Sequence, residues 1–212
     1  MSAAGGRTGR PPLTEERKAE IRLEIARAAV DLFVAQGVTA TTGEQIGQAV
    51  GVSARTVWRY FPSKEACVAP LFTAGVDLLA DRLRRWAPGE SLDGVLVPEL
   101  ATDLAVARGP DRATVGALVR LTRTEPGLRA VWLRTHDEAE PAFARALAER
   151  AGLPEADLRA TVQAAMFNAA LRAAVEHHAW HDADAGPDRT AAEAALERTL
   201  RAALATATEG VT

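Results

Sequence analysis

The sequence predicts an all-α protein. Ala and Leu dominate the 212 residues, aromatic residues account for only 5%, and no alternating apolar run is long enough to form a strand. Apolar residues instead recur at helical spacing between turn signals rich in Gly, Pro and Asp. We therefore expect about nine helices, with a flexible basic arm at residues 1–12, a small three-helix domain at 13–62 and a larger helical domain at 63–212.

The first helix is expected to begin at Leu13 and Thr14 and to end at Gly37. Thr14 is a suitable N-cap, and the acidic residues Glu15 and Glu16 follow it at the positive end of the helix dipole. One stripe of this helix is apolar, which predicts that it supports the elements that follow it. The residues of the stripe are Ile21, Ile25, Ala28, Leu32 and Phe33.

Residues 41–64 have the spacing of apolar and small residues that two short helices need to cross at a tight turn. Thr42 caps the first helix, and Gly47 is small where the two helices approach most closely. Gly51 lies at the turn, where a residue without a Cβ adopts positive φ at little cost. Ser53 caps the second helix. The segment is a predicted helix-turn-helix, which makes DNA the first partner to consider.

The stretch ATTGEQIGQAVGVSARTVWRYFPSKEA also resembles the DNA-binding signature of the TetR family of bacterial repressors. The specific part of the resemblance covers about residues 14–75, and the remainder is similar in helix layout. The resemblance implies a homodimer that binds double-stranded operator DNA and leaves it when a small molecule occupies the second domain. The stretch LVRLTRTEPGLRAVWLRTHDEAEPAFARALAERAG is similar to actinobacterial members, which implies an apolar or amphiphilic effector.

The candidate DNA contacts lie mostly on the second helix of the helix-turn-helix. Such a helix enters the major groove, where Arg55 or Arg59 can bond to O6 and N7 of guanine and Thr56 can touch a methyl group or a phosphate. The resemblance adds Ala54 at a base-contacting position and Lys64 at a phosphate-binding position. The full candidate set is Arg10, Thr42, Ser53, Ala54, Arg55, Thr56, Trp58, Arg59, Tyr60 and Lys64.

Several of these assignments have alternatives. Tyr60 also fits the buried stripe of its helix, and Trp58 can cover apolar surface instead of meeting phosphate. Gly43 departs from the family, whose members often carry a polar or charged residue there, so fewer bases should be contacted from the first helix of the pair. Arg10, within Gly-Arg-Pro, resembles minor-groove arms, but a tail that binds nothing specific is an equal alternative.

In the larger domain, the first helix is expected to open at Pro62 and Ser63 and to continue toward Trp86. Turn signals delimit further helices near 91–107, 111–124, 127–150, 155–180 and 188–207. The helix near 155–180 has two apolar faces: Leu158, Val162, Ala165, Ala169 and Ala173 on one, and Phe167, Leu171, Ala174 and Val175 on the other. The last helix offers Leu196, Leu200, Ala203 and Leu204. The resemblance implies that these two helices form a dimer interface, and the alternative is that both faces belong to a monomer's core.

Effector-binding candidates are side chains that interrupt a simple core pattern. The set is Trp132, His136, Phe143, Met166, Phe167 and Asn168. Each has a structural alternative, because Met fills irregular gaps in cores and a buried Asn can satisfy a neighbouring backbone group.

Charge and composition limit the remaining functions. Residues 1–65 carry nine basic and seven acidic side chains, so the rest of the chain must carry −5 to give the overall −3. That distribution suits site-specific DNA binding by one face or, as the alternative, a nucleoid-associated protein without an effector. His177 and His181 have metal-binding spacing, which leaves a metal sensor or enzyme as a weaker alternative, but no catalytic residue, cofactor or metal is expected. One Cys and the lack of a long apolar run predict a cytoplasmic protein.

Overall fold

The computed structural model describes residues 14–87, 90, 112–154, 157–181 and 189–209. These residues form eight α-helices and one 3-10 helix, with no strand among them, which confirms the predicted fold class. The predicted helix at 91–107 lies outside the described residues, as does Arg10. In chain order the elements are α1 (Glu15–Gln36), α2 (Gly43–Ala49), α3 (Ala54–Tyr60), η1 (Glu65–Val68), α4 (Ala69–Arg85), α6 (Arg112–Leu121), α7 (Pro126–Ala151), α8 (Leu158–His181) and α9 (Arg189–Glu209).

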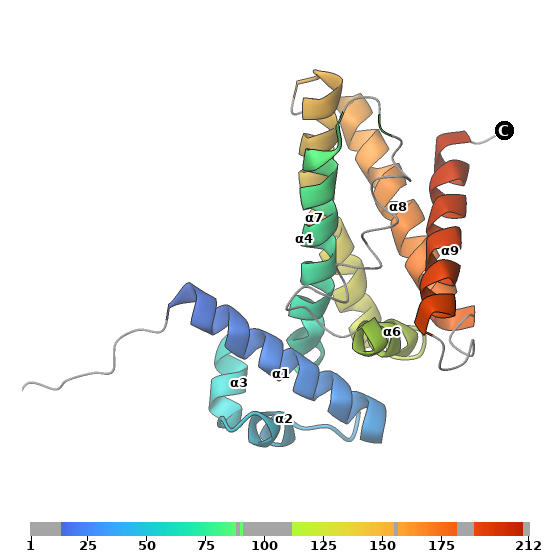
Figure 1. Ribbon diagram of the computed structural model, residues 1–212. Coiled ribbons are helices and arrows are strands. Elements are labelled where there is room, and N and C mark those ends of the chain that lie inside the picture. Colours follow the sequence, from blue (N-terminus) through green and yellow to red (C-terminus); the bar gives the residue numbers. More distant parts are fainter. Residues whose placement is uncertain (1–13, 88–89, 91–111, 155–156, 182–188, 210–212) are drawn as a thin grey trace, which may run out of the picture.

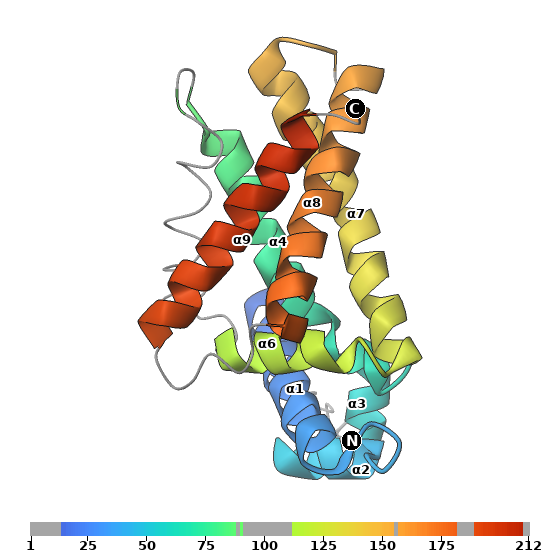
Figure 2. The same cartoon turned by 90° about the vertical axis from the view of Figure 1, so that its right-hand side faces the viewer.

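The helices form a small domain beneath a larger one. Figure 1 shows α1 crossing above α2 and α3, while α4, α7, α8 and α9 rise from this base as long, roughly parallel columns. Turned by 90°, Figure 2 shows α6 lying across the lower end of the long helices, directly above α1. Helix α4 packs against both α1 and α7, so it physically joins the two domains.

Local signals set the ends of the first three helices where the sequence predicts them. The hydroxyls of Thr14, Thr42 and Ser53 each accept a hydrogen bond from a backbone N–H in the first turn of the helix that follows. Thr42 takes part in a complete capping box, because the side chain of Gln45 also accepts from the N–H of Thr42. These bonds satisfy N–H groups that have no partner within the helix.

The turn between α2 and α3 depends on two glycines. Gly51 has φ of 71°, a conformation that residues with a Cβ rarely adopt. A Cβ on Gly47 would lie 2.6 Å from the carbonyl oxygen of Val52, so no larger residue fits where the two helices meet. Both glycines were predicted to have these roles. Val57 and Ile46 are completely buried beneath the turn and attach the pair to α1.

The helix that was predicted to open at Pro62 and Ser63 begins later in the structure. The chain leaves Phe61 in extended backbone and forms the 3-10 helix η1, and α4 itself begins only at Ala69, not at Pro62. The hydroxyl of Ser63 accepts a hydrogen bond from the N–H of Ala66, which favours this tight turn. Cys67 lies in the turn and is completely buried, and burial raises the pKa of its thiol to about 12.

The described apolar core divides into two clusters. The lower one joins α1, α2, α3 and η1 to the first turn of α4 and to α6, α7 and the end of α8, and it includes Phe33, Phe72 and Trp132. The upper one joins the rest of α4 to α7, α8 and α9 around Phe143 and Phe167. No helix within the described residues combines the length and the apolar character needed to cross a membrane.

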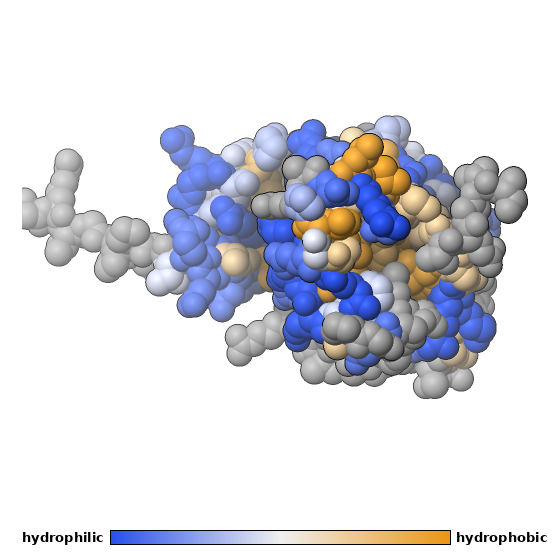
Figure 3. All heavy atoms as spheres, turned by 90° about the horizontal axis from the view of Figure 1, so that it is seen from above, coloured by the Kyte–Doolittle hydropathy of each residue, from blue (hydrophilic) through white to orange (hydrophobic). Residues whose placement is uncertain are grey.

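The apolar residues of α8 and α9 that were predicted to form a dimer interface are partly buried in the chain's own core and partly exposed. Leu196, Leu200 and Leu204 of α9 are buried against the chain's own core, so this part of the predicted interface is internal. On α8 the predicted second face is also internal. The first face is not: Leu158 is 76% exposed and Val162 is 48% exposed. The view onto the upper ends of the long helices in Figure 3 shows apolar surface among hydrophilic residues there.

Candidate functional site

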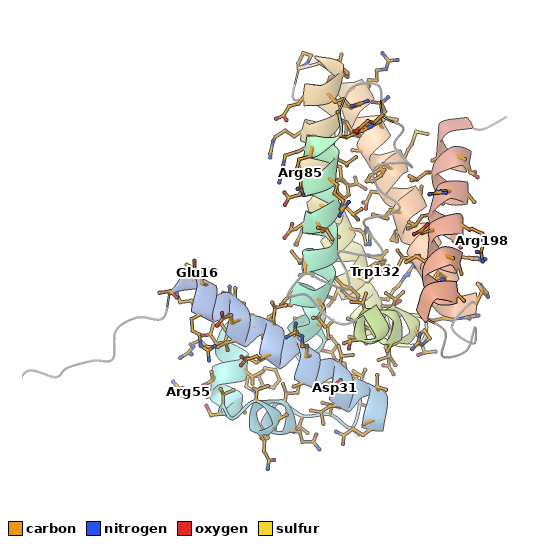
Figure 4. The ribbon with its side chains drawn as sticks, viewed as in Figure 1. Glu16, Asp31, Arg55, Arg85, Trp132 and Arg198 are labelled. Atoms are coloured by element: carbon orange, nitrogen blue, oxygen red, sulfur yellow. The ribbon has the colours of Figure 1, made fainter. Side chains whose placement is uncertain are left out.

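The exposed side of α3 carries the main candidate residues. Val57 fixes the helix by its buried side chain, and this places Arg55, Trp58 and Arg59 on the solvent side. Figure 4 shows Arg55 projecting from α3 at the edge of the small domain. Two long cations beside a large aromatic ring on one short, rigid helix are well suited to contact base edges and phosphates.

Trp58 packs against the first turn of α2. A Cβ built on Gly43 would lie 2.5 Å from Cε2 of the indole and closer still to Cζ2, so the ring occupies the space that a side chain at position 43 would need. Trp58 remains 43% exposed. One part of Trp58 therefore covers α2, as one interpretation predicted, and the other part faces solvent, so its contact with phosphate stays a prediction.

Tyr60 lies beneath two cations. The guanidinium carbons of Arg22 and Arg59 are 5.5 Å and 5.0 Å from the centre of its ring. The side chain is half-buried and packs against the lower core cluster. Cation–π contacts of this kind orient Arg59, so Tyr60 links the first helix to the exposed face of α3.

Lys64 has a role that the sequence did not predict. Its ammonium group donates hydrogen bonds to the carbonyl oxygens of Val38 (2.5 Å), Thr39 (3.3 Å) and Thr41 (3.1 Å). An ammonium has three donors, and all three are used here. Lys64 thus joins the α1–α2 loop to the segment before α4, and its contact with phosphate stays a prediction.

Thr42 and Ser53 use their hydroxyls within the protein as helix caps. The hydroxyls of Ser53 and Thr56 are also 3.0 Å apart. Ala54 is half-buried at the start of α3. A contact of these residues with a partner would come from their remaining exposed surface, so their first effect is to fix where α2 and α3 begin.

The larger domain contains a buried polar pair between α7 and α8. His136 and Asn168 are each 3% exposed, and Nδ1 of His136 lies 2.6 Å from Oδ1 of Asn168. The amide nitrogen of Asn168 donates to the carbonyl oxygen of His136 and to Oε1 of Glu140. Burial lowers the pKa of His136, although the bond to Asn168 opposes this effect. The pair lies between Trp132 of the lower cluster and Phe143 of the upper one.

A second buried polar group was missed by the sequence analysis. Oε1 of Glu176 accepts hydrogen bonds from Nη1 of Arg129 (2.5 Å) and Nε1 of Trp132 (2.7 Å), and Arg172 is 3.4 Å away. The guanidinium of Arg129 in turn lies 5.5 Å from the ring centre of Trp180. These contacts fix the lower end of α7 to α8. No local signal indicates them, because the partners are 44 and 47 residues apart in sequence.

Comparisons with known proteins decide the family. Residues 25–71 match the model of the bacterial regulatory proteins of the tetR family. The chain is 33% identical over 196 residues to the HTH-type transcriptional regulator TcmR of Streptomyces glaucescens, a match that covers 88% of this chain and 86% of TcmR. The chain belongs to the TetR family. It is therefore a transcriptional regulator with a DNA-binding helix-turn-helix, as the sequence predicted.

Solved structures show the same TetR-family fold. The fatty acid degradation regulator FadR from Bacillus halodurans superposes with a TM-score of 0.55 at 20% identity, and covers 89% of this chain and 96% of its own. NalD of Pseudomonas aeruginosa, the secondary repressor of the MexAB-OprM multidrug efflux pump, gives a TM-score of 0.54 at 23% identity with the same coverage.

The structure brings together most of the predicted effector-binding residues of this TetR-family chain. Trp132 and His136 are in contact, with ring centres 4.2 Å apart, and Phe143 meets Phe167 at 5.2 Å. Met166 is not among them: it is 42% exposed, because it lies on the opposite side of α8 from Asn168. Met166 instead continues the exposed apolar face that begins at Leu158 and Val162.

His177 and His181, the weaker metal candidates, are exposed at the end of α8 with ring centres 4.8 Å apart. Within the described residues, no group of three or more His, Cys, Asp or Glu side chains is placed to hold a metal ion.

Proposed function

We propose that this TetR-family regulator is a cytoplasmic repressor that binds a pseudo-palindromic operator as a homodimer and leaves it when a small molecule binds the larger domain. The observation that carries the proposal is the exposed face of α3, where Arg55, Trp58 and Arg59 project from a helix fixed by buried Val57. Arg55, nearest the start of α3, is placed for base contact, because recognition helices meet base edges with their first turns.

The exposed apolar face of α8 supports the homodimer. Leu158, Val162 and Met166 follow one another at four-residue spacing, and the small residues Ala169 and Ala173 continue the same exposed stripe. Three large exposed apolar side chains in line are unusual on a monomer and typical of a protein interface. A second copy of the same helix is the partner that a two-fold dimer supplies, and the alanines allow close approach of the two helices.

A chain of contacts connects the larger domain with the start of the helix-turn-helix. The ring of Trp132 lies 4.7 Å from that of Phe72 in the first turn of α4, and α4 follows η1 directly. Lys64 precedes η1 and holds the loop that leads into α2. Displacement of Trp132 would therefore be transmitted to the helix-turn-helix. A ligand that favours the displaced arrangement lowers DNA affinity by its difference in affinity for the two states.

Binding to DNA from upstream of the protein's own gene tests the proposal. We expect a saturable complex at near-physiological salt that a shuffled sequence of equal length does not form. Equal and weak binding to both DNAs, with a steep dependence on salt, would instead support a nucleoid-associated function. Val162→Glu tests the dimer: sedimentation should give a monomer, while the control variant Gln163→Glu, on the neighbouring exposed position, should remain dimeric.

A further inference from the structure

His136 lies in the contact between α7 and α8, where the buried side chains of Asn168 and Glu176 have hydrogen-bond partners. Its imidazole is 3% exposed, and the ring of Trp132 meets it nearly edge to face, with an interplanar angle of 78°. Apolar clusters lie on both sides, around Phe72 and Trp132 below and around Phe143 and Phe167 above. A hydrogen-bonding group buried in such surroundings is costly unless each of its polar atoms has a partner.

The hydrogen bonds of Asn168 determine which nitrogen of His136 carries the proton. The amide nitrogen of Asn168 has two acceptors, the carbonyl oxygen of His136 at 3.0 Å and Oε1 of Glu140 at 2.9 Å. The amide oxygen must therefore face Nδ1 of His136, 2.6 Å away, and it can only accept. Nδ1 is thus the protonated nitrogen. Because burial lowers the pKa of His136, the ring is neutral and Nε2 is a bare acceptor.

This acceptor has no donor within the described residues. Nε2 of His136 is buried, and no described side chain or backbone group bonds to it. An unpaired buried acceptor is destabilising, because it has lost its hydrogen bonds to water without replacement. Asn168 and Glu140 nevertheless hold the ring in this tautomer, so three residues are arranged to present an unpaired lone pair among aromatic rings. The arrangement favours a partner that brings its own donor.

The surroundings also limit the charge and shape of that partner. A neutral imidazole does not neutralise a carboxylate. The charges that act on His136 are the carboxylates of Glu140 and Glu176 and the guanidinium of Arg172, which is already paired with Glu176, so an anion is disfavoured here. Aromatic rings pack well against other aromatic rings, and those of Trp132 and Phe72 are 4.7 Å apart next to His136. The combination is best matched by an uncharged aromatic ring that carries a hydroxyl group.

We propose that Nε2 of His136 is the anchoring acceptor for a neutral, hydroxylated aromatic ligand bound between α7 and α8. This inference rests on the proposed effector-responsive function and names the chemical class of the effector. A hydroxyl that donates to Nε2 places its ring beside Trp132, the residue that bonds to Glu176 on α8 and contacts Phe72 on α4. Ligand binding at this point thus acts directly on the contacts that lead to the helix-turn-helix.

Matched probes test the proposal on the full chain. Phenol and 2-naphthol supply the donor, and anisole and 2-methoxynaphthalene have the same rings with the hydroxyl hydrogen replaced by methyl. Calorimetric titration should show about five- to 150-fold tighter binding of each hydroxylated probe, because leaving a buried acceptor unpaired costs about 1–3 kcal/mol. Long-range ¹H–¹⁵N spectra of the four histidines should show His136 protonated at Nδ1, and its Nε2 resonance should shift upfield only with the hydroxylated probes.

Two variants complete the design. His136→Phe keeps a ring but removes the acceptor, so it should abolish the preference for the hydroxyl and identify the His136 resonance. His177→Phe, at an exposed histidine, should leave the preference unchanged. Equal affinities of the wild-type chain for hydroxyl and methoxy probes, no binding of either hydroxylated probe at millimolar concentration, or a proton on Nε2 would overturn the proposal. If operator binding is intact in that case, the proposed repressor function stands; loss of operator binding would overturn that function separately.

Discussion

The indole of Trp58 covers Gly43, the first residue of α2, and so ties the exposed face of α3 to the start of the other helix of the pair. The two residues lie fifteen positions apart. Gly43 is therefore better explained by the space the indole needs than by the backbone conformation of its own helix. TetR-family members often carry a polar residue at the position of Gly43. The glycine here and the tryptophan at position 58 are explained by the same contact.

Gly43→Ala should destabilise the small domain and weaken operator binding, because the new methyl group must displace Trp58. Overpacking of this kind costs about 1–3 kcal/mol. When Trp58→Tyr is added to the Gly43→Ala chain, the smaller ring should recover most of the lost stability. The double variant should therefore be more stable than the sum of the two single effects predicts. Gly75→Ala is the control, since a Cβ there meets nothing within 4 Å. Denaturant unfolding of the wild-type chain, the two single variants and the double variant measures the coupling energy between positions 43 and 58. Strictly additive effects would contradict the contact.

Lys64→Met should lower the free energy of unfolding by about 1.5–3 kcal/mol, the contribution typical of hydrogen bonds to a charged group. The reason is that three carbonyl oxygens of the α1–α2 loop lose their donor. Lys18→Met is the matched control at the protein's other lysine, whose ion pair with Glu15 lies at the surface and contributes little to stability. Unchanged stability, with a salt slope of DNA binding lowered by about one, would instead show that Lys64 contacts phosphate.

Arg55→Ala should relax base preference at one position in each half-site and cost about 1–3 kcal/mol of specific binding. Arg134→Ala, an exposed position on α7, should change neither quantity. Competition binding with operators substituted one base pair at a time provides the measurement. If the Arg55 variant keeps both its affinity and its preferences, the assignment of the base-contacting residues is wrong.

Stability should fall with acidification through His136. Its folded-state pKa lies below the ordinary value of 6.5, chiefly because of burial. Below pH 6.5 the unfolded chain therefore binds more protons than the folded chain, and the free energy of unfolding decreases until the folded-state pKa is reached. Above pH 6.5 this contribution is complete and constant. Thermal unfolding between pH 5 and 8 should show that stability depends less steeply on pH in His136→Phe than in the wild-type chain. The same pH dependence in both chains would show that His136 is not buried as a neutral ring.

The features predicted from sequence are those with local causes. Thr14, Thr42 and Ser53 lie within three residues of the N–H groups they cap, and Gly47 and Gly51 act within one turn, so a single chain was enough to place them. The helix-turn-helix and the candidate arginines of its second helix also followed from the residues, and the resemblance to the TetR family added Ala54 and Lys64 as candidate DNA contacts.

The features that sequence reasoning missed or misplaced depend on contacts between distant segments. The carbonyl partners of Lys64 lie 23 to 26 residues earlier, and Glu176 meets Arg129 across 47 residues. Leu196 and Leu200 face the chain's own core because of how α9 packs on α8, which periodicity does not specify. Met166 and Phe167 are adjacent in sequence yet lie on different sides of α8, and only packing shows which side is internal.

Selection of bound sequences from random DNA, with the mass of the resulting complex, tests the central claim most directly. We predict a two-fold symmetric motif whose half-sites lie about one helical turn, or about 34 Å, apart, with two protomers bound to it. An Arg55→Ala chain should select a motif that is less specific at one position per half-site. If no motif is enriched, and binding follows salt concentration alone, the chain does not recognise an operator through α3 and the proposed function is contradicted.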